Sequence, residues 1–239
     1  MTSLMFDYAE LPYGSGKDQK ARNRFNWRYE LLFTRNKELI QDKVILDLAC
    51  NNGRLSYPCL ALGAKKIIGV EARQELIETG KKYLHGTGFE NKMEFIQADL
   101  FEYMSSVSKG EFDLILCCGF LYHTVKQVEF FRLLKQISPS STIIDTNVAT
   151  NYCWYGLKNF LKKPPMLYMI IEDPDKTSDT TDIDGVAFWP TPSFLESMFD
   201  VIGYDYRQIR YSSREIKDWY GMNDYKKGYR VSYVGHRKS

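Results

Sequence analysis

The sequence has few of the residues that cross-link small proteins. Among 239 residues there are five cysteines, an odd number without a Cys-X-X-Cys pair, and only three histidines. Neither a disulfide framework nor a Cys/His zinc site is therefore expected, and we predict no metal. A domain of this length buries enough surface to fold without such links. The adjacent Cys117 and Cys118 lie in an apolar run, which is typical of buried thiols in a reducing compartment.

Long apolar runs are also missing. No apolar stretch reaches the roughly 18 residues that a membrane-spanning helix needs. Residues 1–14 lack the basic segment and following apolar segment of a signal peptide. We therefore expect a cytoplasmic protein without a membrane partner. The content of 44% apolar and 26% charged residues is that of an ordinary globular chain rather than a disordered or repetitive one.

Charge is distributed unevenly along the chain. Residues 17–37 carry seven Lys and Arg against two acids, and residues 204–239 carry nine against four. Each end thus holds +5, and the net charge of +2 leaves −8 for the remainder. Such runs are often solvated faces. The alternative is that both ends meet beside an anionic substrate.

Apolar patterning predicts an α/β fold. From about residue 43, short β-branched runs alternate with helical stretches, as in a parallel sheet covered on both faces. The expected strands are 43–50, 65–72, 93–99, 112–120 and 141–148, and the expected helices are 53–63, 73–86 and 128–138. A further helix is predicted to start at Thr191, with a capping box closed by Glu196. Strands follow at about 204–211 and 230–236, the second alternating like an antiparallel edge strand.

The domain organisation follows from one break in this rhythm. Residues 149–190 contain Lys-Lys-Pro-Pro at 162–165 and an acidic polar stretch at 172–184. We interpret them as a lid or substrate segment inserted in a single domain over 40–239, preceded by a helical extension over 1–39. The alternative is a solvated insertion without a function.

The loop after the first strand is the first place to look for a ligand. Ligands of doubly wound sheets bind beyond the carboxyl ends of the strands, at the point where the strand order reverses. A dinucleotide fingerprint needs glycines where this loop has Ala49, Asn51 and Arg54, so a pyrophosphate cradle fits poorly. A Walker loop is absent as well.

This loop resembles motif I of the class I S-adenosylmethionine-dependent methyltransferases, written DxGxGxG. Asp47, Ala49, Asn51 and Gly53 stand on its four written positions. Further elements follow in the family's order: Glu71 ends strand two, Asp99 ends strand three, and FDLILCCGFLYH stands at strand four and the residues just after it. The resemblance covers about residues 40–148. It implies a doubly wound, Rossmann-like sheet of seven strands with the last strand antiparallel, and S-adenosyl-L-methionine as the cofactor, with S-adenosyl-L-homocysteine as the product.

The resemblance also implies roles for individual residues. The 47–53 loop would lie against the methionine part of the cofactor. Glu71, followed by Ala72, would accept both ribose hydroxyls, for which a carboxylate is well suited. Asp99 would meet the adenine amine, with Leu100 beside it. Cys118, at the end of strand four, completes the expected cofactor-binding set.

The expected acceptor site lies after strand four. His123 could take a proton from the acceptor, because an imidazole titrates near neutral pH; alternatively it braces the following helix. Tyr122, Arg230 and the basic helix at 22–28, with Arg24 and Trp27, are the other candidates. Methyl transfer from a sulfonium depends mainly on positioning and desolvation, so no catalytic triad is required.

Residues 119–123, Gly-Phe-Leu-Tyr-His, resemble the GVLYH of the tRNA wobble-uridine carboxymethyltransferases, which use carboxy-S-adenosylmethionine. The likeness extends to Trp189-Pro190 and to Arg230 at the start of the last strand. In that family the corresponding tyrosine and arginine bind the extra carboxylate together with a lysine, for which this chain offers only Lys17, out of register. Tyr122 and Arg230 could equally hold an anionic group of a substrate.

Taken together, these patterns predict a methyltransferase acting on an oxygen or nitrogen nucleophile of a small, anionic or sugar-like acceptor. One alternative is alkyl transfer from carboxy-S-adenosylmethionine to a tRNA uridine. Another is a module that binds S-adenosylmethionine without turnover. A small-molecule acceptor ranks above tRNA because no appended RNA-binding domain is evident. The oligomeric state is left open.

Overall fold

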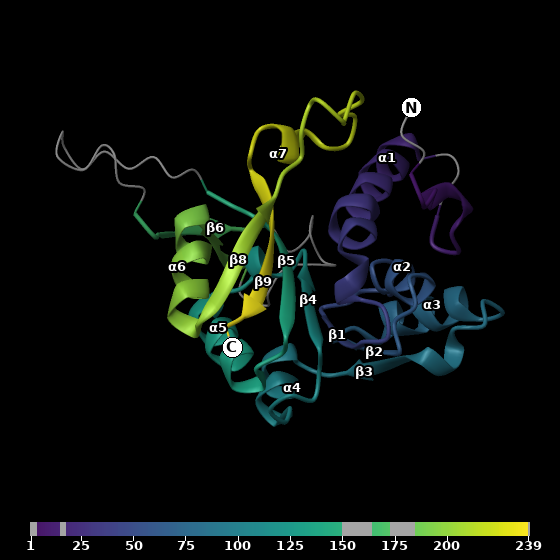
Figure 1. Ribbon diagram of the computed structural model, residues 1–239, viewed down its shortest axis with the longest axis horizontal. Helices are drawn as coiled ribbons and strands as arrows, with labels where there is room; N and C mark the ends of the chain where they lie inside the picture. The colour runs from purple at the N-terminus through teal and green to yellow at the C-terminus, as the bar shows by residue number, and fades with distance from the viewer. Residues whose placement is uncertain (1–3, 15–17, 150–163, 173–184, 239) are drawn as a thin grey trace.

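A seven-stranded sheet forms the centre of the protein, seen in the computed structural model (Figure 1). The structure describes residues 4–14, 18–149, 164–172 and 185–238. The strand order is β3-β2-β1-β4-β5-β9-β8. The bounds are β1 Val44–Leu48, β2 Lys66–Glu71, β3 Met93–Gln97, β4 Leu114–Cys118, β5 Ser141–Asn147, β8 Tyr204–Ile209 and β9 Arg230–Arg237.

The first five strands are parallel, and β9 runs antiparallel to both β5 and β8. The expected doubly wound sheet with an antiparallel last strand is thereby confirmed. The expectation that β9 is an edge strand was wrong, since β8 occupies the edge. The alternation in β9 comes from small residues that suit a buried strand. Ser232 is fully buried, and a Cβ on Gly235 would lie 2.6 Å from Phe199.

Helices cover both faces of the sheet. They are α1 Gln19–Arg28, α2 Ser56–Ala61, α3 Gln74–Leu84, α4 Leu100–Ser106, α5 Gln127–Ile137, α6 Pro192–Ile202 and α7 Asn223–Lys226. Neighbouring strand residues enter different cores: Ile45 packs with residues of α1 and α2, and Leu46 packs with residues of α4, α5 and α6. This alternation follows from the pleat of a strand that is buried on both sides.

Helix α6 begins where predicted, but its cap differs. Thr191 is the N-cap, and its hydroxyl accepts a hydrogen bond from the backbone N–H of Phe194 at 3.2 Å. The predicted capping box was wrong, because Phe194 occupies the third helical position and Glu196 lies two residues beyond it. Its carboxylate instead accepts a hydrogen bond from the hydroxyl of Tyr233 at 2.9 Å.

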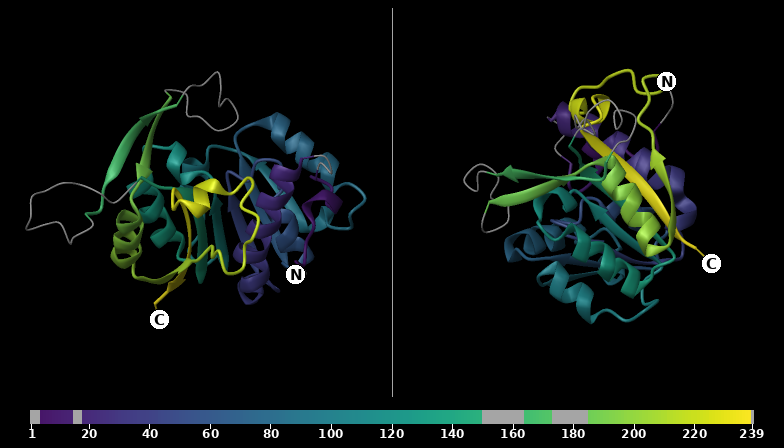
Figure 2. Two further views of the ribbon diagram at one scale, coloured as in Figure 1. Left: turned by 90° about the horizontal axis from the view of Figure 1, so that it is seen from above. Right: turned by 90° about the vertical axis from the view of Figure 1, so that its left-hand side faces the viewer.

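Part of the interrupting segment forms a separate hairpin of β6 Leu167–Ile171 and β7 Val186–Pro190. The hairpin extends away from the main sheet (Figure 2). Its β7 strand is fastened to the loop after β4, since Phe188 N–H donates to the carbonyl of Thr124 at 3.0 Å. The remaining parts of the predicted lid, residues 150–163 and 173–184, lie outside the described residues.

Candidate functional site

A cavity of about 810 Å³ lies at the carboxyl ends of β1, β2 and β4, where the strand order reverses. Such a switch point is the usual ligand site of this architecture. The predicted site residues that line the cavity are Asp47, Ala49, Asn51, Glu71, Ala72, Asp99, Leu100, Cys118, Tyr122, His123, Arg24 and Arg230. Two predicted residues lie elsewhere: Trp27 packs in the core, 9% exposed, and Gly53 faces Met93 and Phe95.

The loop after β1 has the backbone conformation of a glycine-rich turn, although it contains few glycines. Ala49, Asn51 and Gly53 have φ values of 52°, 55° and 81°. Asparagine tolerates this left-handed region, whereas alanine adopts it only under strain. A Cβ on Gly53 would lie 3.0 Å from Cε of Met93. The loop is therefore held in shape by its surroundings rather than by its own preferences.

Asp47 begins this loop in a buried setting. One carboxylate oxygen, Oδ2, accepts a hydrogen bond from the hydroxyl of Ser56 at 2.5 Å. Burial raises the pKa of Asp47 to about 7, the nearby charge of Glu71 adds to the rise, and the Ser56 hydrogen bond opposes it. Any cation in the cavity would favour the ionised form.

Glu71 is fixed by the backbone on both sides. The N–H of Asn51 donates to Oε2 at 2.9 Å, and the N–H of Arg73 donates to Oε1 at 3.1 Å. The residue is 4% exposed and lines the cavity. Each oxygen keeps lone-pair capacity, so a pair of adjacent ligand hydroxyls fits this carboxylate.

Asp99 has a structural role that the sequence reading missed. It is the N-cap of α4, and its Oδ1 accepts hydrogen bonds from the N–H groups of Phe101 at 2.8 Å and Glu102 at 3.0 Å. The Asp-X-X-Glu spacing before an amphipathic stretch is the signal that could have predicted this helix. Both bonds use Oδ1, and Asp99 also lines the cavity.

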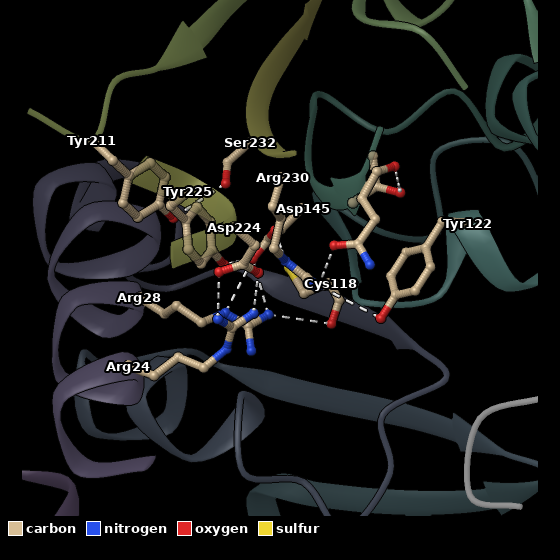
Figure 3. Close-up of polar contacts among 12 residues, drawn as sticks. Arg24, Arg28, Cys118, Tyr122, Asp145, Tyr211, Asp224, Tyr225, Arg230 and Ser232 are labelled. Carbon is tan, nitrogen blue, oxygen red and sulfur yellow. Dashed lines mark hydrogen bonds and ion pairs between the residues drawn. The ribbon is translucent and has the colours of Figure 1, made fainter. Parts of the chain in front are cut away.

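On β5, the strand next to β4, the carboxylate of Asp145 binds two arginines (Figure 3). Nε of Arg28 donates to Oδ2 of Asp145 at 3.0 Å, and Nε of Arg230 donates to Oδ1 at 2.7 Å. The hydroxyl of Tyr225 also donates to Oδ2, at 2.7 Å. We call these four residues the arginine cluster. Burial alone would raise the pKa of Asp145, but the charges of Arg230 and Arg28 lower it to about 2.

The arginine cluster gives this end of the cavity an excess of positive charge. Two guanidinium groups face one carboxylate, and Arg28 and Arg230 both line the cavity. Nη1 of Arg230 is held by Asn147 Oδ1 at 3.1 Å and lies 3.5 Å from the hydroxyl of Tyr122. A buried charge without a full complement of partners favours a bound counter-ion.

The two basic ends of the chain do meet. Arg24 on α1 forms a two-bond ion pair with Asp224 on α7, at 2.8 and 2.7 Å. The side-chain amide of Asn23 donates to the carbonyls of Asp218 and Tyr220. Much of the charge at this junction is therefore paired within the protein, and the arginine cluster supplies the excess.

His123 is buried with one ring nitrogen paired. Its Nδ1 lies 2.7 Å from Oε2 of Glu172, and its side chain is 8% exposed. Its Nε2 is buried and has no hydrogen-bond partner among the described residues. Burial lowers the pKa of His123 and Glu172 opposes that effect, while the charges of Arg230 and Arg73 lower the pKa further. The ring is thus neutral at neutral pH.

Several of these residues were not singled out from the sequence. Arg28 lay in the basic helix expected at the acceptor site, but its partners were not foreseen. Asp145, Tyr225 and Glu172 come from β5, α7 and the hairpin, and no local pattern joins them. Asp145 alone left a signal, because a carboxylate in the middle of a buried β-branched strand requires a cationic partner. Within the described ranges, no helix has the length and hydropathy to cross a bilayer. No group of three metal-ligating side chains is found in that part of the chain either.

Comparison with solved structures assigns the fold. The N-terminal domain of EvdMO1 with S-adenosylhomocysteine bound superposes with a TM-score of 0.62 at 18% identity, covering 93% of this chain and 82% of that one. Magnesium protoporphyrin IX methyltransferase from Synechocystis PCC 6803 gives 0.59 at 14% identity, covering 95% and 88%. The architecture is therefore that of the class I methyltransferases.

Sequence comparison refines this assignment. Residues 45–139 match the family described as a methyltransferase domain, so this part of the chain is a methyltransferase domain. The tRNA U34 carboxymethyltransferase of Helicobacter pylori (strain HPAG1) is 30% identical over 101 residues, 42% of this chain and 38% of that protein. Protein arginine N-methyltransferase 1 of Saccharomyces cerevisiae is 35% identical over 72 residues, 30% and 20% of the two chains. The chain thus spans less than half the length of both relatives.

Proposed function

We propose that the protein transfers a methyl group from S-adenosylmethionine to an oxygen or nitrogen nucleophile of a small anionic acceptor. The observation that carries this proposal is one cavity with two chemically different ends. Glu71 and the loop after β1 lie at one end, and the arginine cluster lies at the other. The match of residues 45–139 to the methyltransferase domain supports the cofactor assignment.

The residues of the first end fit the cofactor. Glu71 presents a fixed carboxylate for the two ribose hydroxyls, and Asp99 keeps one oxygen for the adenine amine. Asp47 supplies negative charge near the β1 loop, which suits a sulfonium and an ammonium group. At about 810 Å³ the cavity is near the top of the range of roughly 300–1,000 Å³ for small-molecule sites, so a second small molecule fits beside the cofactor.

The second end fits an anion. Guanidinium groups bind carboxylate and phosphate oxygens through paired N–H donors. Because Arg28 and Arg230 are already held by Asp145, they lose little side-chain freedom when an anion arrives. Positioning the acceptor in this way is the main contribution that a protein makes to methyl transfer.

Native mass spectrometry of the freshly purified chain tests the proposal. Denaturation should release S-adenosylmethionine or S-adenosylhomocysteine, and incubation with small hydroxy acids and sugar phosphates should form S-adenosylhomocysteine. Neutral analogues of the same size should react poorly. Failure to bind either nucleoside in calorimetry would overturn the proposal, and binding without turnover on any acceptor would indicate a cofactor-binding module.

The arginine cluster favours one second candidate, alkyl transfer from carboxy-S-adenosylmethionine to a tRNA uridine. Arg230 and Tyr122 could hold the extra carboxylate of that cofactor, with Arg28 in place of the lysine. The similarity to the Helicobacter pylori tRNA U34 carboxymethyltransferase supports this candidate. Release of a carboxylated nucleoside in the same mass spectrum, and tighter binding of it than of S-adenosylmethionine, would select it.

A further inference from the structure

Glu172 has no role in the methyl transfer as proposed above. It directly follows β6 and reaches His123, which lies in the helical turn Leu121–His123 after β4. We propose that Glu172 is a positioning residue that orients His123 as the general base of the transfer. This inference rests on the proposed function and narrows its substrate class. The acceptor must carry a hydroxyl or protonated amine that gives up its proton, together with an anionic group.

The pair is held by contacts that are independent of it. The side-chain amide of Gln127 donates to the carbonyls of Leu121 at 3.0 Å and Phe188 at 2.6 Å, bridging the turn and the hairpin. The Phe188 N–H donates to the carbonyl of Thr124. The hairpin is therefore fixed to the segment that carries His123, and a catalytic pair can keep its geometry.

The contact selects the tautomer of His123. An ionised carboxylate only accepts hydrogen bonds. Nδ1 of His123 must therefore carry a proton and donate a hydrogen bond to Glu172, at 2.7 Å. The neutral ring then has its lone pair on Nε2, the nitrogen without a partner among the described residues. His123 lines the cavity. A residue that lines a ligand site and keeps a nitrogen lone pair without a partner there has what a general base requires.

The charges around the ring suit this role. Glu172 favours the imidazolium that forms when Nε2 takes a proton, whereas burial, Arg230 and Arg73 disfavour it. The ring is thus unprotonated before reaction, and its protonated form has a counter-charge at hydrogen-bonding distance. This is the division of labour of an acid–histidine pair, in which the carboxylate orients the ring and stabilises its cation without taking the proton.

The step balances in atoms and charge. The acceptor oxygen or nitrogen forms its bond to the methyl carbon as the carbon–sulfur bond breaks, and that bonding pair stays on sulfur. The proton of the acceptor passes to Nε2 of His123, and the imidazolium later releases it to solvent. The positive charge of the sulfonium is thereby replaced by that of the imidazolium beside Glu172.

The anionic group of the acceptor follows from the position of Tyr122. Its ring centre lies 3.9 Å from that of His123, and the guanidinium carbon of Arg230 lies 5.3 Å from the same ring. The base and the arginine cluster therefore flank one side chain. A single small molecule can give its proton to His123 while its carboxylate or phosphate meets Arg230.

Nitrogen NMR of the whole 239-residue chain with labelled histidine tests the proposal without knowledge of the acceptor. The chain has three histidines, so the His123 signals are assigned by their loss in His123→Asn. At neutral pH His123 should carry its proton on Nδ1. In Glu172→Gln its pKa should fall by about one unit, because a close opposite charge is lost. Glu75→Gln, at an exposed site on α3, is the matched control and should leave the pKa unchanged.

Two results would overturn the proposal: a neutral ring protonated on Nε2, or the same His123 pKa in Glu172→Gln as in Glu75→Gln. Glu172→Ala provides a second variant if Glu172→Gln does not fold. Binding of S-adenosylhomocysteine is measured on the same samples. A normal affinity with an unchanged pKa would reject only the role of Glu172, whereas absence of binding in the unaltered protein would reject the proposed function.

Discussion

Arg28 and Arg230 bind opposite oxygens of the same buried carboxylate, although they come from α1 and β9. The side chain of Asp145 is 0% exposed, and those of Arg28 and Arg230 are 7% and 5% exposed. Two positive charges in such a buried site, where the dielectric constant is low, repel each other strongly unless anions lie between and beside them. The intervening carboxylate accounts for one of the two charges, and a bound anion would account for the other.

Removal of this carboxylate should destabilise the protein severely. Asp145→Asn leaves two buried guanidinium groups without a counter-charge, and we expect it to lower the free energy of unfolding by about 3–5 kcal/mol. Urea unfolding followed by circular dichroism measures the loss. Asp205→Asn is the control, because the Asp205 side chain is 75% exposed and its ion pair with Lys238 contributes little. Equal stabilities for the two variants would contradict the central role of Asp145.

The same cluster should resist acid until low pH. The pKa of Asp145 is lowered to about 2 from the ordinary 3.8, so its ionised form is favoured by folding. The stabilisation is complete above the ordinary value and is lost as the pH falls through 2. The difference in unfolding free energy between the unaltered protein and Asp145→Asn should therefore stay constant above pH 5 and shrink between pH 4 and 2. A difference that already shrinks at pH 6 would refute the assignment.

Strain in the β1 loop can be relieved. Ala49 has φ of 52°, which glycine adopts without a steric cost. Ala49→Gly should raise the free energy of unfolding by about 0.5–1 kcal/mol, after the greater freedom of glycine in the unfolded chain is subtracted. Gly53→Ala should have the opposite effect, because its φ is 81° and the added Cβ would crowd Met93. Thermal unfolding of both variants checks the two signs.

Glu71 should determine cofactor affinity. Glu71→Ala removes the proposed acceptor of the ribose hydroxyls and should weaken binding of S-adenosylhomocysteine by about 1–3 kcal/mol, or roughly 5- to 150-fold. Isothermal titration calorimetry gives the dissociation constant. Glu75→Ala, on the exposed side of α3, should bind normally. Normal binding by both variants would remove Glu71 from the cofactor site.

Asp47 should link cofactor binding to protons. Its pKa is raised to about 7, so part of the population is protonated at neutral pH, and a bound sulfonium favours the ionised form. The affinity for S-adenosylmethionine should therefore rise between pH 5 and 8, with proton release on binding below pH 7. S-adenosylhomocysteine lacks the sulfonium charge and should show a weaker dependence. Calorimetry in buffers of different ionisation enthalpy measures the released protons, and Asp47→Asn should abolish the difference.

Much of the sheet could be predicted from the sequence, because buried parallel strands are continuous β-branched runs that need no partner to be recognised. Strands β1 to β5 were located to within a few residues. The position of β9 between two strands could not be read, since Ser232 and Gly235 interrupt its apolar residues in the way that polar positions interrupt those of an edge strand. Helix α4 was missed because the Asp99 signal was assigned to a ligand alone.

The residues of the candidate site also fall into those that the sequence could predict and those that it could not. Asp47, Glu71 and Asp99 follow from a rule about strand ends, because every parallel strand of the sheet delivers its carboxyl end to one edge. The arginine cluster and the pair of His123 with Glu172 depend on contacts between distant segments. Their partners were set by tertiary packing, which leaves no periodic pattern in the sequence. The sequence therefore indicated cationic groups for the proposed acceptor end, Arg230 among them, but not the carboxylates of Asp145 and Glu172.

The link that Asp145 of β5 forms between α1 and β9 has a consequence for the order in which the protein becomes functional on the ribosome. A domain can begin to fold while its later residues are still being added. Asp145 and Arg28 can meet once β5 has emerged, but Arg230 and Tyr225 arrive only with α7 and β9. A nascent chain can thus form the part of the cavity around Glu71 and the β1 loop early, whereas the proposed site for an anion is complete only after translation has passed β9.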